Sequence, residues 1–66
     1  MKTQFYDVLF NSKTSTLAES SRLFNTKRAA IRWARYLAKQ HYVSTAQVWI
    51  AGAGGQLVFE VHNKSI

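Results

Sequence analysis

The residues with the clearest chemical potential in this 66-residue chain are cations spaced three and four positions apart. Arginine guanidinium groups make paired hydrogen bonds with phosphates, and lysine adds a compact positive charge. On a wheel of ~100° per residue these cations fall within one narrow arc. They are Arg28, Arg32, Arg35 and Lys39, with Lys27 just before them. The spacing predicts a surface that binds phosphate or other anionic groups.

This arrangement is unfavourable for an isolated helix. Arg28 and Arg32 stand four positions apart, and like charges at that separation destabilise a helix by ~0.2–0.5 kcal/mol per pair. No Asp or Glu occurs in residues 25–41 to compensate. From Arg28 to Lys39 the stripe spans ~16 Å at ~1.5 Å per residue, which is enough to meet several phosphates. An anionic partner is one physical reason for such a face, and an ordinary solvated surface on a basic protein is the alternative.

The opposite side of the same stretch is apolar, which predicts an amphipathic helix over residues 25–41. Asn25 or Thr26 would cap its first turn by accepting a hydrogen bond from a backbone N–H. The apolar side consists of Ala30, Trp33, Ala34 and Leu37, with His41 at its edge. Trp33 is therefore predicted to lie in the core.

Alternating apolar residues predict strands on both sides of this helix. The segments are residues 4–10, 46–51 and 56–62, with a less regular one at 16–24. A turn is predicted at residues 11–14, and a glycine-rich one at residues 52–55 joins the last two strands. In that hairpin, one wholly apolar face results from pairing Ile50 with Leu57, Val48 with Phe59 and Ala46 with Val61. Residues 63–66 are predicted to form a loose tail.

The order strand, strand, helix, strand, strand predicts a small α+β domain. It would be an antiparallel sheet of three to four strands in ββαββ order, with one helix packed across one face. Residues 16–37, with the pattern LAES…F-x-T-K-x-x-A, resemble the strand-to-helix step of small YegP-type ββαββ domains. The resemblance implies the architecture alone and carries no function.

The composition restricts the class of protein. A chain of 66 residues predicts a single domain over residues 1–66, and such a domain buries only ~60% of its unfolded surface. Without Cys it has neither disulfides nor a Cys-based zinc site, which leaves aromatic packing or a homodimer as support. The net charge of +6 favours an acidic partner. No signal peptide or apolar run of ~18 residues occurs, so the predicted location is cytoplasmic, with no membrane partner.

No set of residues points to a reaction, so we expect no enzyme, no catalytic residue and neither a metal nor a cofactor. Asp7, Glu19 and Glu60 are scattered singly along the chain. The two histidines, without Cys or a nearby acid, make a poor metal set. The glycine-rich turn at residues 52–55 lacks the Lys-Ser/Thr pair of a phosphate-binding loop.

Trp49 alternates away from the apolar face of the predicted hairpin, on the side of the sheet that one helix cannot cover. Phe5 or Leu9 would lie beside it on the first strand. An exposed aromatic patch of this kind can be buried in a homodimer or under a second layer. It can also stack nucleobases. We favour burial and take Trp49 as the candidate interface residue.

Two functions of different classes fit these features. The first is a small basic nucleic-acid-binding protein, DNA-binding or RNA-binding, that neutralises phosphates and releases counterions largely without regard to base sequence. Its contacts would be Lys27, Arg28, Arg32, Arg35 and Lys39. The alternative is a protein-interaction module, an inhibitor or adaptor, that docks on an acidic protein surface. Binding to a membrane surface fits less well, because the sheet and the membrane would compete for one apolar helix face.

Overall fold

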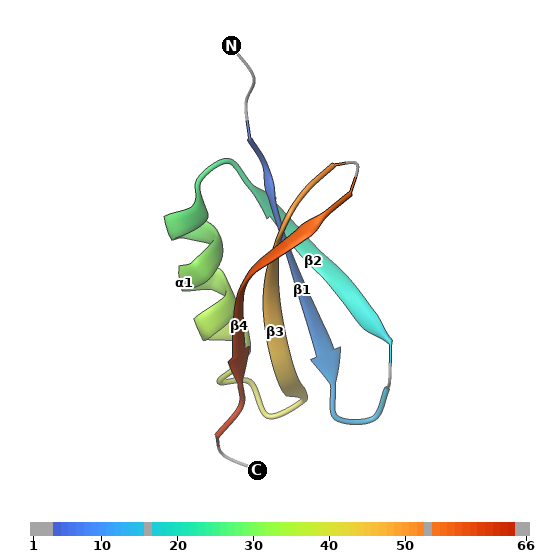
Figure 1. The fold of residues 1–66 in the computed structure, drawn as a ribbon. Helices are drawn as coiled ribbons and strands as arrows, with labels where there is room; N and C mark the ends of the chain where they lie inside the picture. The colour runs from blue at the N-terminus through green and yellow to red at the C-terminus, as the bar shows by residue number, and fades with distance from the viewer. Residues whose placement is uncertain (1–3, 16, 53, 65–66) are drawn as a thin grey trace.

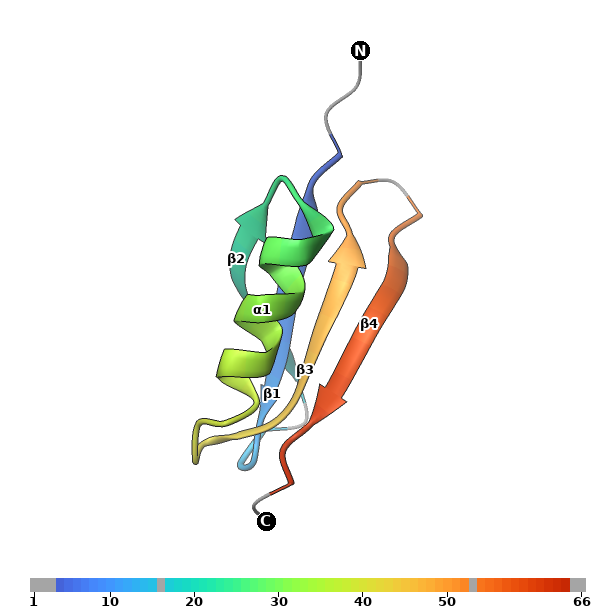
Figure 2. The same cartoon turned by 90° about the vertical axis from the view of Figure 1, so that its left-hand side faces the viewer.

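The computed structural model describes residues 4–15, 17–52 and 54–64 and contains four strands and one helix (Figure 1). In chain order the elements are β1 (Tyr6–Ser12), β2 (Ala18–Phe24), α1 (Lys27–Leu37), β3 (Val43–Ile50) and β4 (Gln56–His62). The strands form one antiparallel sheet in the order β2-β1-β3-β4, and α1 lies across one face (Figure 2). The predicted ββαββ order and the α+β class are confirmed.

Small side chains form much of the contact between α1 and the sheet. Ala30 and Ala34 on the helix are fully buried, and they pack against Val8 of β1 and Val48 of β3. Because alanine side chains are short, the helix can lie close to the central strands. Trp33 is half-buried at the border of this core and does not lie within it, which corrects the prediction that it is a core residue.

The β3–β4 hairpin follows the predicted register for two of its three pairs. Val48 lies opposite Phe59 and Ala46 opposite Val61, but the register shifts between Val48 and Trp49. Ile50 therefore faces Gln56 instead of Leu57, and Leu57 faces Trp49. A bulge adds one residue to a strand and breaks the two-residue alternation, so a continuous register assumed from the sequence fails beyond it.

Glycines make the turn that joins β3 to β4. Gly52 and Gly54 have φ angles of 125° and 81°, which side-chain-bearing residues rarely adopt. Ala53 in this predicted turn lies outside the described residues, as does Thr16 in the predicted second strand. At the other end of the sheet, β1 continues to Ser12, so the turn predicted at residues 11–14 begins later than expected.

A second bulge lies in β2, where Ser21 is skipped between the pairs Val8–Arg22 and Leu9–Ser20. The Ser21 hydroxyl donates to the Val8 carbonyl at 2.7 Å and accepts from Trp33 Nε1 at 3.1 Å. The bulge thus turns a polar side chain towards the helix, where it holds the indole of Trp33.

The helix is shorter than its sequence pattern predicts. Thr26 is the N-cap, and its side chain accepts a hydrogen bond from the Ala29 N–H at 3.2 Å. The helix ends at Leu37, because the next backbone bonds tighten to three-residue spacing at Lys39 and Gln40. The prediction of a helix to residue 41 is therefore wrong.

Asn63 ties the end of β4 to the loop that follows the helix. It is buried, and its Nδ2 donates to the carbonyls of Gln40 at 3.0 Å and Val43 at 2.8 Å. The predicted loose tail therefore starts too early, since Asn63 is part of the folded structure. Residues 65–66 of that tail lie outside the described residues.

Candidate nucleic-acid interface

The outer side of α1 carries four of the five predicted cations, Lys27, Arg28, Arg32 and Arg35. Their side chains are exposed, on the opposite side of the helix from buried Ala30, Ala34 and Leu37. Ile31 supplies an apolar base for a groove of about 580 Å³ among them. The other residues that line this groove are Lys27, Arg28, Arg32 and Arg35. Four of the five cations predicted from the sequence therefore share one continuous surface.

Lys39 differs from the other predicted contacts. It lies beyond the C-terminal end of α1, in a turn where its N–H bonds the Tyr36 carbonyl at 3.1 Å. The helical part of the basic face is therefore shorter than the ~16 Å expected, about 10 Å from Arg28 to Arg35 at ~1.5 Å per residue. Lys39 extends this surface past the helix, although it does not belong to the stripe.

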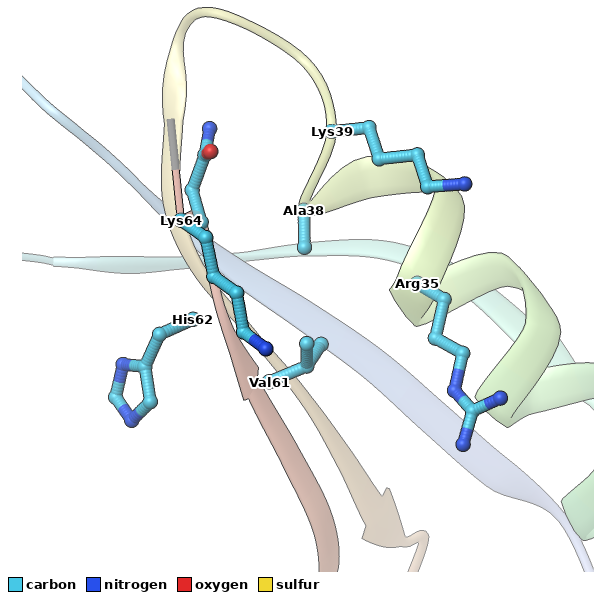
Figure 3. Close-up of a pocket in the computed structure, with 7 residues that line it drawn as sticks. Arg35, Ala38, Lys39, Val61, His62 and Lys64 are labelled. Atoms are coloured by element: carbon cyan, nitrogen blue, oxygen red, sulfur yellow. The ribbon is translucent and has the colours of Figure 1, made fainter. Parts of the chain in front are cut away.

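A second hollow, of about 420 Å³, lies between the end of α1 and the end of β4 (Figure 3). Ala38 and Val61 give it apolar walls, and Figure 3 shows Val61 directed towards the helix side while the His62 ring points away. The residues that line it are Arg35, Ala38, Lys39, Val61, His62, Asn63 and Lys64. Three cations from two parts of the chain thus meet around one partly apolar hollow.

Arg35 joins the groove to this hollow. Its guanidinium carbon lies 5.5 Å from the centre of the Phe59 ring, so a strand residue orients it towards β4. Lys64 was not among the predicted site residues because it stands in the predicted tail. Only the pairing of β4 with β3 and the Asn63 hydrogen bonds bring Lys64 beside Arg35 and Lys39.

Among the described residues, these cations have no acidic partner within salt-bridge distance. Within the described part of the chain, no Lys or Arg lies within 4.0 Å of a carboxylate, and the ion pair found joins His62 Nε2 to Glu60 Oε1 at 3.6 Å. Asp7 instead accepts a hydrogen bond from Ser20, and Glu60 accepts one from Gln47. Both acids lie on the face of the sheet away from α1, so the positive charge of the helix layer stays available to a partner.

That other face, which we call the open face, is made of residues that alternate away from the helix. Trp49 lies there as predicted, half-buried, with its Nε1 donating to Gln47 Oε1 at 3.3 Å. Register places Asp7 and Leu57 on either side of it, and Leu23 beyond Asp7. Leu23 and Leu57 are 57% and 41% exposed, so an apolar row crosses the sheet with one acid inside it.

Two further findings concern other kinds of site. In residues 4–15, 17–52 and 54–64, no three His, Asp or Glu side chains gather closely enough to hold a metal ion. In the same residues, no helix combines the length and the hydropathy needed to cross a bilayer.

No protein-family model, curated protein or solved structure matches this chain. The resemblance to YegP-type domains therefore depends on the quoted sequence pattern alone.

Proposed function

We propose that this protein binds nucleic acid through the basic face of α1, extended at one end by Lys39 and Lys64. The observation that carries the proposal is the absence of any acidic partner for these cations among the described residues. A fold selected for stability alone would place Asp or Glu between them, since like charges four positions apart are repulsive. Phosphates would supply the missing charge, and the helix groove presents several contacts in a line. We place this function in the cytoplasm, which is one of the compartments that contain nucleic acid.

The salt dependence of binding tests this proposal. If Lys27, Arg28, Arg32 and Arg35 each contact a phosphate, log K should fall with log salt with a slope of about −3.6 on duplex DNA and about −2.8 on single strands. Affinity for duplex should then drop roughly 150-fold between 50 and 200 mM salt. Fluorescence anisotropy with labelled duplex DNA, single-stranded DNA and RNA measures both quantities.

An acidic polypeptide of matched charge is the control for the alternative function. The proposal expects it to bind more weakly than nucleic acid at every salt concentration. Binding to the acidic polypeptide with none to nucleic acid at ~50 mM salt would contradict it. That result would favour a module that docks on acidic proteins.

The proposal includes a homodimer formed through the open face. Two copies packed there would bury the Leu23–Trp49–Leu57 row. Their basic helices would then lie on opposite outer sides of the dimer. This face contains the acids Asp7 and Glu60, whereas the cations of α1 lie on the other side of the sheet, so two copies that meet here keep their basic helices apart. The helix surfaces of both copies then remain free to contact nucleic acid.

Trp49→Lys is expected to convert this dimer into a folded monomer, because it places a cation in the centre of the apolar row. Sedimentation velocity measures the mass, and circular dichroism reports the fold. Tyr36→Lys is the matched control, since Tyr36 is an exposed aromatic residue on the helix side and its replacement should leave the mass unchanged. A wild-type protein that sediments as a monomer contradicts the expectation.

A further inference from the structure

Three aromatic side chains form a cluster along the side of α1 that faces β2. The rings of Trp33 and Tyr36 are stacked, with centroids 5.2 Å apart and an angle of 26° between their planes. Phe24, at the end of β2, lies 6.3 Å from Trp33 at 47°. Tyr36 is 53% exposed although its ring is stacked on Trp33. We call Phe24, Trp33 and Tyr36 the aromatic platform.

Hydrogen bonds and a cation hold the platform in place. Trp33 Nε1 donates to the Ser21 hydroxyl, which itself donates to the Val8 carbonyl in the central strand β1. The guanidinium carbon of Arg22 lies 5.2 Å from the centre of Phe24 and 5.7 Å from that of Trp33. A surface fixed in this way loses little side-chain freedom when a ligand binds, which favours affinity.

The platform adjoins the basic face of the helix through Arg32. A hollow of about 320 Å³ is lined by Arg32, Ala29 and the three platform residues. Arg32 also lines the basic groove on the other flank of the helix. A ligand that carries an aromatic ring next to a phosphate can therefore contact both surfaces at once.

We propose that the aromatic platform stacks an unpaired nucleobase, which makes single-stranded nucleic acid the preferred partner. This inference rests on the proposed function and specifies its ligand. A base in a duplex is paired and stacked inside the nucleic-acid double helix, so its face cannot reach Trp33 or Tyr36. A base in a single strand exposes its face and remains attached to a phosphate that Arg32 can bind. Stacking is available to every base, so the preference is for strandedness and not for sequence.

Comparison with an abasic strand isolates the stacking contribution. An oligothymidine and an abasic oligonucleotide of equal length carry the same phosphates, so charge neutralisation is the same for both. The wild-type protein should bind the oligothymidine about 5- to 150-fold more tightly, the range expected for one stacked base. Oligouridine, tested in parallel, should show a similar advantage over its own abasic strand, since stacking does not depend on the sugar.

Tyr36→Ala should remove most of that advantage while leaving affinity for the abasic strand and for duplex DNA within about twofold. Tyr36→Phe keeps the ring and should retain the advantage. Tyr42→Ala is the matched control, because Tyr42 is similarly exposed, at 46%, but lies in the loop before β3, away from the platform. Its affinity for oligothymidine should stay within about twofold of wild type.

Fluorescence provides a second measurement that does not depend on affinity. In a Trp49→Phe background Trp33 is the only indole, and saturation with oligothymidine should quench its emission more than saturation with the abasic strand.

Equal affinity for base-containing and abasic strands, or an unchanged advantage in Tyr36→Ala, overturns the platform proposal while phosphate binding stands. Absence of binding to every strand and to duplex overturns the proposed function itself, and the platform with it.

Discussion

Replacing Val48 with aspartate is expected to unfold this domain. Val48 is fully buried in the central strand β3, between Val8 of β1 and Phe59 of β4. An unpaired carboxylate at such a position costs several kcal/mol, since it loses its hydration without gaining a partner. A domain of this length has a total stability of about 3–10 kcal/mol. The substitution is therefore expected to consume most or all of the free energy of unfolding.

Thr45→Asp is the matched control for this prediction. Thr45 lies in the same strand but on the open face, opposite His62 and Asn11. Thr45 is only half-buried and lies four residues along the strand from Trp49, so a carboxylate there keeps part of its hydration, and the midpoint of urea unfolding should fall much less than in Val48→Asp. Far-ultraviolet circular dichroism and urea titration of the two variants measure the difference. A Val48→Asp protein that unfolds as cooperatively and as late as Thr45→Asp would show that the helix does not cover this face of the sheet.

The sequence predicted the architecture because periodicity reports which side of an element is buried. Two patterns were sufficient to predict the order of elements and the packing of one helix on one face of the sheet. They are the two-residue alternation along β3 and β4 and the helical period around Ala30 and Ala34. The failures occurred where tertiary contacts override periodicity. Bulges shift the register near Trp49 and Ser21, and the chain leaves the helix at Leu37 to reach β3.

The position of Trp33 shows the same limit at the level of one side chain. A large apolar residue on the inner side of a helix predicts a core position, but the space between α1 and the central strands is filled mainly by alanine and valine, with Leu37 at the end of the helix. Trp33 is placed towards β2, where its indole nitrogen can donate to Ser21. That partner exists only because of the β2 bulge, which no pattern in the sequence specifies.

The candidate site was predictable where it depends on one helix and not where it depends on two elements. Arg28, Arg32 and Arg35 share an arc by local geometry alone, and the structure leaves all three exposed. The position of Lys64 beside Arg35 and the aromatic platform both depend on contacts between a strand and the helix, which local periodicity does not specify. From the sequence, Trp49 was the aromatic residue considered for a surface role, with burial in an interface favoured over base stacking, whereas the aromatic surface beside the cations contains Trp33 and Tyr36.

The largest effect on binding is expected from Arg28→Ala/Arg32→Ala/Arg35→Ala. Each phosphate contact contributes about one decade of affinity at ~50 mM salt, so loss of three should weaken duplex binding on the order of a thousandfold. The salt slope should fall by about 2.7 at the same time. Relief of like-charge repulsion and loss of the Arg35 contact with Phe59 are both small and opposite in sign, so stability should be nearly unchanged.

Lys13→Glu/Thr14→Glu separates a specific face from general attraction to a basic protein. The change at Lys13 removes two units of positive charge and that at Thr14 removes one, which equals the three removed from the helix. Both control residues are exposed in the turn between β1 and β2, outside the helix face.

If binding were diffuse attraction to net charge, the two variants would weaken alike and show the same salt slope. A helix-centred interface requires the control to retain nearly the wild-type slope, because slope counts phosphates contacted and not total charge. Equal slopes for the two variants would therefore reject the helix face as the site, even if both proteins still bind.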